Sequence, residues 1–309
     1  MGGLVTTRIA HFSDTHVLAI GNASLNQFLN KRITGAVNLI LNRSRHYRTE
    51  VFEAVLDAIS AEKADHVVCT GDLVNLALKA EFEKVRELLG KHFAPGELTI
   101  VPGNHDYYVK EAMELAHFEE MFRDYLPQPK GNEDIYPFVR HLDSVAIIGL
   151  CSAVEQPFFY AGGRIGASQL EAMESLHRDP AVRDKFKIVL VHHPLVPDPE
   201  RRLEFTRRLE DANAFIEMLW TLEDDAPDMV LNGHNHRYRR CYLPGTSVIN
   251  VQAASASRFG GKHPAEYNMY EIDDGILQTI KRRIYDPDTN AFTEAIAYDH
   301  RVATVRTGI

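Results

Sequence analysis

The sequence predicts an α/β protein in which two packed mixed β-sheets are flanked by helices, as a four-layer αββα sandwich. Two observations carry this prediction. Over residues 4–101, short apolar strands alternate with helices, which is typical of parallel strands covered by helices. Two further apolar segments, 136–141 and 145–151, are separated by only three residues, which indicates a hairpin-like pair that begins a second sheet.

The composition is that of an ordinary globular protein. The chain has 309 residues, of which 45% are hydrophobic, and this is enough for a well-buried core. No internal repeat or Gly/Ser-rich linker divides it, so residues 1–309 are expected to form a single domain. The net charge of -9 argues against a general basic surface, and no nucleic-acid-binding surface is expected.

The first half of the chain alternates between strands and helices. A strand at 4–12 is rich in apolar and β-branched residues, and Thr49 is a suitable N-cap for a helix that begins there. Further elements are expected as a helix at 49–61, a strand at 66–70, a helix at 79–91, a strand at 98–101 and a helix at 109–125.

The segment 24–48 is the least expected part of the chain, because apolar residues recur in it at near-helical spacing amid arginines and lysines. It predicts a basic amphipathic helical insertion that acts as a cap over the first ligand loop. Two interpretations stay open. Its basic residues form a solvated face, or the segment is a lid that binds an anionic or lipid-like substrate or touches an acidic membrane surface.

The second half of the chain predicts more helices and strands. Helices are expected at 167–177 and 202–223, and strands at 187–191, 229–231, 247–252, 266–272 and 277–283. The turn Gly162-Gly163-Arg164 is either an ordinary turn or one that holds a phosphate. Residues 286–309 give no clear signal.

Five apolar segments each stop abruptly at residues that can bind a metal ion. A carboxylate at the carboxyl end of a strand is held rigidly and faces a crevice. Clustered imidazoles that are buried without a ligand leave polar groups unpaired. The five endings are Asp14-Thr15-His16, Gly71-Asp72, Gly103-Asn104-His105-Asp106, His192-His193-Pro194 and Gly233-His234-Asn235-His236.

In this order the five endings resemble the motifs of the calcineurin-like metallophosphoesterase family, and in particular its class III cyclic-nucleotide and glycerophosphodiester phosphodiesterases. The match covers most of the chain. The resemblance implies the two-sheet sandwich and a pair of divalent or mixed-valence metal ions. Ligands that supply only nitrogen and oxygen atoms suit Mn, Fe, Zn or Co and do not decide among them. It implies that Asp72 bridges the ions, that Asp14, His16 and His236 hold the first, and that Asn104, His192 and His234 hold the second.

The resemblance also implies a mechanism. Two ions about 3.5 to 4 Å apart make hydroxide available near neutral pH and neutralise the phosphoryl oxygens, so a hydroxide that bridges them attacks phosphorus. His105 would face the leaving-group oxygen as general acid or donor, with Asp106 fixing its tautomer and raising its basicity. Asn104, His105 and His193 are expected beside the substrate. Gly233 is expected to permit the tight turn that directs the two following histidines to different ions.

Hydrolysis of a phosphodiester is the preferred reaction, because His105 next to Asn104 is similar to diester-cleaving members of the family. One alternative is cleavage of a lipid-linked nucleotide pyrophosphate of the UDP-diacylglucosamine type, motivated by the 24–48 segment and Phe158-Phe159-Tyr160, although such enzymes carry arginine where His105 stands. A phosphomonoesterase is another. From a different class, the chain could be a non-catalytic metal-binding scaffold, but all seven expected ligand positions are filled.

The cysteines and the termini bear on location. Cys69, Cys151 and Cys241 show no CxxC pairing, which indicates small buried thiols in a reducing compartment. The first residues lack a basic region followed by an apolar segment, and no run of about 18 apolar residues occurs, so neither a signal peptide nor a transmembrane helix is expected. The protein is expected in the cytoplasm, with peripheral membrane contact as an option. Its expected partners are a small phosphate ester or a lipid-linked substrate, and a second copy of the chain in a homodimer.

Overall fold

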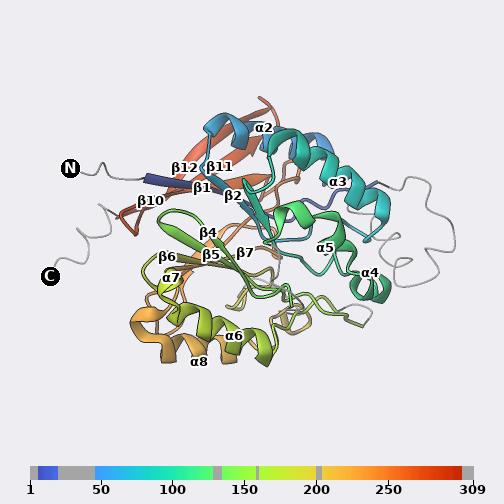
Figure 1. The fold of residues 1–309 in the computed structure, drawn as a ribbon. Helices are drawn as coiled ribbons and strands as arrows, with labels where there is room; N and C mark the ends of the chain where they lie inside the picture. Colours follow the sequence, from blue (N-terminus) through green and yellow to red (C-terminus); the bar gives the residue numbers. More distant parts are fainter. Residues whose placement is uncertain (1–5, 20–45, 128–133, 158–159, 200–203, 301–309) are drawn as a thin grey trace.

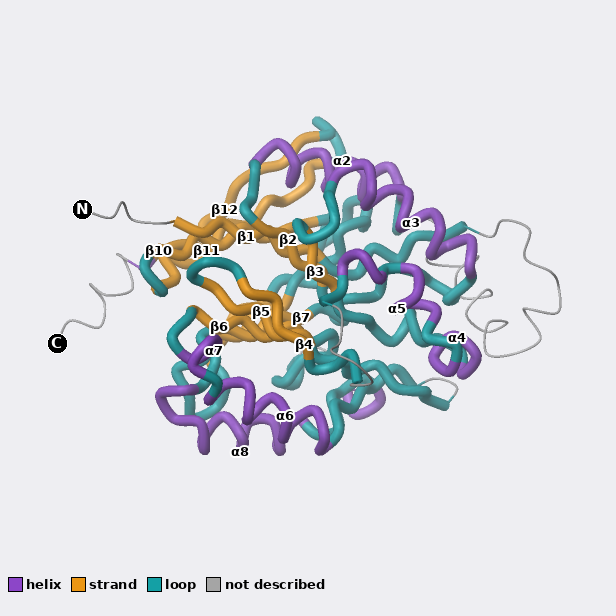
Figure 2. Tube along the Cα trace, viewed as in Figure 1, coloured by secondary structure: helices purple, strands orange, loops and turns teal. Residues whose placement is uncertain are grey.

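Two six-stranded β-sheets form the centre of the molecule (Figure 1). Helices cover the outer face of each sheet, so the predicted four-layer αββα sandwich is confirmed (Figure 2). The computed structural model describes residues 6–19, 46–127, 134–157, 160–199 and 204–300.

The first sheet has the strand order β12-β11-β10-β1-β2-β3. β1, β2 and β3 run parallel, because helices connect them, whereas β10, β11 and β12 pair antiparallel. Asp274 and Gly275, at φ 51° and 73°, form the tight turn between β10 and β11. The strands are Thr6–Phe12 (β1), His66–Cys69 (β2), Leu98–Ile100 (β3), Glu266–Asp273 (β10), Ile276–Asp286 (β11) and Ala291–Asp299 (β12).

The second sheet has the order β4-β5-β6-β7-β9-β8. β4 and β5 form the antiparallel pair that the sequence predicts, and β5, β6, β7 and β9 run parallel. The antiparallel strand β8 closes the far edge. The strands are Phe138–His141 (β4), Val145–Gly149 (β5), Phe186–Leu190 (β6), Met229–Asn232 (β7), Arg239–Tyr242 (β8) and Ile249–Gln252 (β9).

The helices lie in two groups. α2 and α3 lie over the first sheet, and α6 and α8 lie over the second, on the opposite side of the molecule (Figure 1). Their bounds are Thr49–Glu62 (α2), Lys79–His92 (α3), Lys110–Glu114 (α4), His117–Met121 (α5), Ala167–Arg178 (α6), Pro180–Arg183 (α7) and Ala212–Leu222 (α8).

The core follows the alternation of strand side chains. In β5, Ile147 belongs to the cluster that includes β1 and α2, whereas its neighbour Ile148 belongs to the cluster that includes α6 and α8. Met173 of α6 and Phe215 of α8 fill this second cluster. Successive strand residues point to opposite faces, so one central strand serves both layers of the core.

Two predicted elements differ from the structure, and the tail contains a strand that was not predicted. The helix at 109–125 is broken into α4, α5 and a short 3-10 turn, because Ala116 lies at φ 48° in the left-handed region. The helix at 202–223 is shorter, since α8 begins only at Ala212. Before it, the chain pairs with another loop: Gly163 and Leu209 form an isolated β-bridge. The tail without a signal contains β12.

The proposed cap falls mostly outside the described residues. Residues 20–45 are not described, so only the end of the 24–48 segment is placed. There, Tyr47 forms an isolated antiparallel bridge with Arg258, next to the start of α2.

Candidate metal centre

The carboxyl ends of β1, β2, β3, β6 and β7 supply the predicted ligands. Parallel strands of one sheet place these ends at the same edge, and the two sheets bring their edges together. All the predicted ligands are buried except Asn104, which is half-buried. The side chains that this edge carries are Asp14, His16, Asp72, Asn104, His192, His234 and His236.

Five of these ligands have a left-handed backbone. The φ angles are 54° for Asp14, 45° for His16, 55° for Asp72, 72° for His234 and 57° for His236. Residues other than glycine rarely adopt this region, and each costs about 1 to 3 kcal/mol, so such strain concentrates at functional sites. The fold therefore holds these five side chains in sharp turns that an ordinary loop would avoid.

The first cluster contains Asp14, His16, Asp72 and His236, whose ligand atoms lie within 4.8 Å of one another. Nε2 of His16 lies 2.9 Å from Nε2 of His236. Oδ1 of Asp14 lies 3.1 Å from Nε2 of His236 and 3.8 Å from Nε2 of His16. Two nitrogens and carboxylate oxygens therefore converge on one point, as the sequence predicts for the first ion.

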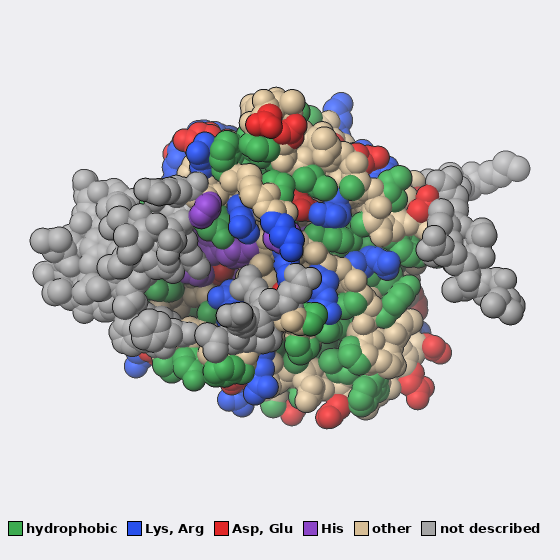
Figure 3. Space-filling model, turned by 180° about the vertical axis from the view of Figure 1, so that it is seen from behind, with side chains coloured by type: hydrophobic (Ala, Val, Ile, Leu, Met, Phe, Trp, Pro, Cys, Tyr) green, Lys and Arg blue, Asp and Glu red, His purple; other side chains and the backbone are tan. Residues whose placement is uncertain are grey.

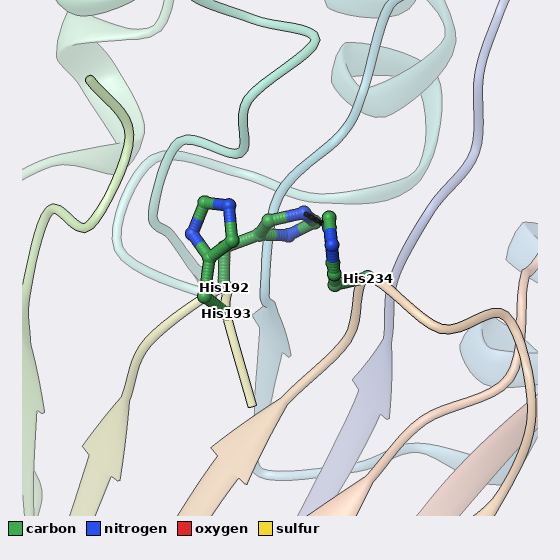
Figure 4. A group of neighbouring side chains, drawn as sticks. All are labelled: His192, His193 and His234. Carbon is green, nitrogen blue, oxygen red and sulfur yellow. Dashed lines mark hydrogen bonds between the residues drawn. The ribbon is translucent and has the colours of Figure 1, made fainter. Parts of the chain in front are cut away.

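The second cluster contains His192, His193 and His234 (Figure 4). His192 and His193 follow β6, whereas His234 follows β7, and Figure 4 shows their rings gathered above the two strand ends. Nε2 of His192 lies 3.2 Å from Nδ1 of His234. The grouping joins His192 and His234 as predicted.

Asp72 lies between the two clusters. Its Oδ2 is 3.4 Å from Nε2 of His192 and 3.8 Å from Nε2 of His16. Its Oδ1 accepts a hydrogen bond of 2.7 Å from the backbone amide of His105. This is the position that a carboxylate shared by two ions requires.

The donor atoms of the site fit a divalent cation. Nδ1 of His192 donates to the carbonyl of Thr70 at 2.6 Å, so in the neutral ring Nε2 keeps its lone pair and faces the other cluster members. Oδ1 of Asn104 is buried with no hydrogen-bond partner among the described residues. The imidazole nitrogens and carboxylates that converge in the clusters, with the amide oxygen of Asn104 as a further candidate, are the nitrogen and oxygen donors typical of first-row metal sites.

The electrostatics of the site also favour a cation. Burial opposes charge on Asp72 and His192, but the attraction between them holds the pKa of Asp72 well below its usual range. Burial alone would lower the pKa of His192, but the carboxylates of Asp72 and then Asp14 raise this pKa to about 9. The field that favours a proton on His192 favours a metal ion at the same place.

Two glycines at the site leave room for functional side chains. A Cβ on Gly233 would lie 2.5 Å from Oδ2 of Asp14, and one on Gly163 would lie 2.2 Å from Nδ1 of His193. Gly233 does not have a positive φ, whereas His234 does. The expectation that Gly233 permits the turn is therefore wrong: this glycine provides space, and the histidine takes the strained conformation. Gly163, in the Gly162-Gly163-Arg164 turn, likewise lets the His193 ring approach the backbone closely. The sequence left open whether this turn binds a phosphate.

His105 is anchored by a backbone carbonyl. Its Nδ1 lies 2.7 Å from the carbonyl oxygen of Asn75, and its ring stands at 4.9 Å from the ring of His16, edge to face. An N–H held by a carbonyl fixes the tautomer and raises the basicity of the other nitrogen. In the neutral ring the lone pair is then on Nε2, and the ring lies beside His16 of the first cluster.

The predicted role of Asp106 as the partner of His105 is wrong. Its Oδ2 accepts from the amides of Asp72 and Gly103 at 2.9 and 2.8 Å. Its Oδ1 accepts from the amides of Leu73 and Val74 at 2.9 and 3.2 Å. A carboxylate with four backbone donors is fully engaged, so Asp106 stabilises the turn that carries Asp72. The partner of the His105 ring is instead the backbone carbonyl of Asn75.

His193 has protein partners on both ring nitrogens. Nδ1 lies 2.8 Å from Oγ of Ser152, and Nε2 lies 3.2 Å from the carbonyl oxygen of Ala161. Burial above all lowers its pKa, so the ring is neutral. Its place next to His192 and His234 agrees with the prediction that it lies near the substrate, and its contact with substrate stays a prediction.

Two residues near the site were not predicted from the sequence. Oη of Tyr47 lies 2.6 Å from Nδ1 of His236, and Nη2 of Arg207 donates to the carbonyl of His234 at 3.2 Å. Tyr47 lies in a basic segment without a motif, and Arg207 lies in a loop that was predicted to be helical, so neither carried a recognisable signal. Arg207 adds to burial in lowering the pKa of His234.

Several histidines lie outside the two clusters. Burial lowers the pKa of His11 and of His66 to about 3 and that of His177 to about 4, so all three are neutral core residues. His11 bonds to Tyr270 and His66 to Thr99, each at hydrogen-bonding distance. Histidine side chains are visible on the face shown in Figure 3, with lysine and arginine side chains beside them.

The two-sheet sandwich and the two ligand clusters at the strand ends define a metal-dependent hydrolase. A model of the calcineurin-like phosphoesterases matches residues 7–238. The chain belongs to the calcineurin-like phosphoesterase family, whose members hydrolyse phosphate esters with metal ions. Comparison with curated protein sequences gives no match.

Solved structures resemble the whole fold. A dimetal phosphatase from Danio rerio superposes with a TM-score of 0.61 at 11% identity, over 94% of this chain and 99% of the other. Purple acid phosphatase PPD1 from yellow lupin superposes with a TM-score of 0.60 at 13% identity, over 97% of this chain and 55% of the other. GAP50, the anchor in the inner membrane complex of Plasmodium, superposes at 0.51 and 12% identity, over 96% and 88%. At such identities the likeness shows the fold.

Two findings bear on the surroundings of the protein. Within the ranges that the structure describes, no helix has the length and apolar character needed to cross a membrane. Cys69, Cys151 and Cys241 are free thiols, and the first two are buried.

Proposed function

We propose that the protein is a phosphodiesterase with a dinuclear metal centre. The observation that carries this proposal is the placement of His105, whose Nδ1 is held by the Asn75 carbonyl while its ring packs against that of His16. A diester leaves as an alkoxide, which needs a proton, and a histidine fixed beside the ligand clusters can supply it from Nε2. A monoester or an activated aryl ester makes a smaller demand on such an acid.

The residues that would hold the ions follow from the clusters. Asp14, His16 and His236 would hold one ion and Asn104, His192 and His234 the other, with Asp72 shared between them. When bound, two such ions supply a nucleophile near neutral pH and neutralise charge on the phosphoryl oxygens. The donor set contains no thiolate, which suits Mn, Fe, Zn or Co.

The chain's own groups complete the reaction. The Asp106 carboxylate holds the turn around Asp72, so the shared ligand keeps its direction. In this proposal Asn104 and His193 lie beside the phosphoryl group; His193 belongs to the second cluster, where its ring packs against that of His234. His105 would donate its proton to the leaving oxygen and regain one from water.

Turnover of four substrates by the Mn²⁺-loaded protein tests the proposal. We expect faster hydrolysis of bis(p-nitrophenyl) phosphate than of p-nitrophenyl phosphate, with cyclic AMP as a natural diester. A preference for the monoester would overturn the assignment. A lipid-linked pyrophosphate completes the panel, and detergent-dependent activity on it alone would favour the pyrophosphohydrolase that the sequence left open.

Metal analysis separates the enzyme from a scaffold. A protein that retains less than about one ion per chain after Mn²⁺ loading would favour a non-catalytic scaffold. We also propose a cytoplasmic location, which the three free thiols support.

A further inference from the structure

A cavity of about 510 Å³ adjoins the first ligand cluster. His16, a member of the cluster, and Tyr47, which contacts His16 and His236, line the cavity, and Phe259 and Tyr285 contribute aromatic surface. A volume of this size matches a small organic ligand or a substantial part of one. None of the predicted ligands other than His16 lines it, so the cavity extends the site away from the ligand clusters.

The cavity lies on the side of His105. Asn75 lines the cavity and its carbonyl holds His105, while its Nδ2 donates to the backbone carbonyl of His16, another lining residue. The group that donates a proton to the leaving oxygen is therefore separated from the cavity by a single residue. Because His16 belongs both to the first cluster and to the lining of the cavity, a substrate held at that cluster would place the rest of its leaving group in this space.

Asn75, which lines the cavity, carries a buried acceptor that lacks a partner among the described residues. Oδ1 of Asn75 has no hydrogen-bond partner among the described residues, and Asn75 is 1% exposed. Because Nδ2 is committed to the His16 carbonyl, the amide orientation is fixed and Oδ1 is an acceptor. A buried acceptor without a donor costs free energy, and a hydroxyl or amine of a ligand would satisfy it. The carboxylate of Glu50, which also lines the cavity, offers a second acceptor.

The cavity also presents a fixed cation. The guanidinium of Arg48 lies 3.6 Å from the centroid of the Phe259 ring, and its backbone amide donates to the carbonyl of Ser257 at 2.9 Å. No carboxylate pairs with Arg48 among residues 6–19, 46–127, 134–157, 160–199 and 204–300, and its side chain is exposed. An arginine that stacks on a ring keeps its N–H donors available for an anion.

We propose that this cavity binds the leaving group of the substrate, and that this group is an alcohol that carries further hydrogen-bond donors and a second anionic group. Arg48 recognises the anion, and Asn75 with Glu50 receives the donors. The inference rests on the proposed phosphodiesterase function and adds the class of substrate to it. It assigns specificity to side chains that supply no metal ligand, Arg48 and Phe259 among them.

Two diesters that match in shape but differ in charge test the role of Arg48. Each probe is compared with itself between variants, because nitrophenolate is also the better leaving group. Nitro and carboxylate groups are similar in shape, so bis(4-nitrophenyl) phosphate and bis(4-carboxyphenyl) phosphate are matched probes. In Arg48→Ala we expect KM for the carboxylate probe to rise about fivefold, the size of one exposed ion pair, with KM for the nitro probe unchanged. Arg178→Ala, which removes an exposed arginine of α6 paired with Glu174, should change neither. An equal rise for both probes, or no rise for either, overturns the proposal.

A binding measurement separates this inference from the proposed reaction. Saturation-transfer NMR follows the free alcohol 4-hydroxybenzoate on the metal-free protein, where no turnover takes place. We expect equal signals in the wild type and in Arg178→Ala, and a weaker signal in Arg48→Ala, in line with an affinity reduced about fivefold. Binding that depends on Arg48 without hydrolysis of either diester would support the cavity and refute the phosphodiesterase. Binding that ignores Arg48, or no binding, would refute the cavity assignment even if diesters are cleaved.

Discussion

The phenol oxygen of Tyr47 lies 2.6 Å from Nδ1 of His236, a predicted ligand of the first ion. The Tyr47 ring also meets the ring of His16 at 5.1 Å, close to perpendicular. A tyrosine that holds the far nitrogen of a ligand histidine fixes both its ring orientation and its tautomer. Tyr47 therefore positions His236 without contributing a donor atom of its own to the cluster.

Replacement of Tyr47 by phenylalanine should weaken metal retention. Loss of an outer partner of a ligand histidine commonly costs about 10- to 100-fold in metal affinity, and we expect the lower end of that range because the ring packing remains. Competition with a chelator measures the affinity. Tyr242→Phe, at an exposed tyrosine of β8, is the matched control and should leave it unchanged. Equal affinity in Tyr47→Phe would show that His236 needs no such partner.

Replacement of Asp72 by alanine should abolish both metal binding and turnover. Its carboxylate is the one shared by the two histidine clusters, so its removal takes a ligand from each ion at once. Elemental analysis after Mn²⁺ loading gives the metal content. Asp224→Ala removes an exposed carboxylate and serves as the control. Full occupancy in Asp72→Ala would contradict the shared position.

Replacement of His105 by alanine should keep the metal and reduce the rate. General acid catalysis commonly contributes about 10²- to 10⁴-fold, so kcat should fall by that order while metal content is unchanged. The loss should be larger for an alkyl leaving group than for p-nitrophenolate, which departs without a proton. A uniform loss for both leaving groups would speak against an acid at this position.

Replacement of Gly233 by alanine should disturb the site and lower stability. The new Cβ would approach Oδ2 of Asp14 to 2.5 Å and Oγ of Ser13 to 2.0 Å, so a buried ligand must shift. We expect a loss of about 1 to 3 kcal/mol in the free energy of unfolding, with reduced metal content. Gly90→Ala in α3, where the nearest atom is 3.8 Å away, should instead stabilise by about 0.5 to 1 kcal/mol. Denaturant titration of both variants measures the free energy of unfolding. Equal values for Gly233→Ala and Gly90→Ala would contradict the inference that Gly233 leaves space for Asp14 and Ser13.

Stability of the metal-free protein should fall as the pH drops below about 6.5. Burial lowers the pKa of His66 to about 3 and that of His177 to about 4, so the folded state keeps both neutral while the unfolded chain binds protons. Between about pH 6.5 and 4, each group removes up to about 1.4 kcal/mol per pH unit. Urea titrations at several pH values measure the slope. His177→Gln should make it shallower, and an unchanged slope would contradict the neutral buried histidine.

Much of the fold was predictable, because hydrophobic period and chain order are local properties. Strands such as β2 and β6, short apolar runs between helices, were placed to within a residue or two. The predicted helix 202–223 was wrong in its first part, before α8, because tertiary contacts determine that segment. The backbone of Gly163 pairs with residues 208–210, and Asp211 accepts from the amides of Ile165 and Gly166. Such pairings join residues about 45 positions apart and leave no periodic trace.

The ligand set was predictable for a different reason. Each motif joins a strand end to residues of metal-binding type, and parallel strands bring such ends together whatever the loops do. Partners were harder to predict. The carbonyl of Asn75, which anchors His105, and the four amides around Asp106 are backbone groups, and every residue possesses them. The amino-acid sequence therefore does not reveal which backbone groups will contact His105 or Asp106 in the folded protein.

The layered construction of the site has a mechanical consequence. Asp14 and Asp72 extend from the first sheet, while His192 and His234 extend from the second, and the His234 amide already donates to Asp14 across that seam. A cation bound by ligands from both sheets would cross-link the two sheets. Release of the ions would then be coupled to separation of the two sheets. We therefore expect the melting temperature of the protein to rise with the free metal concentration.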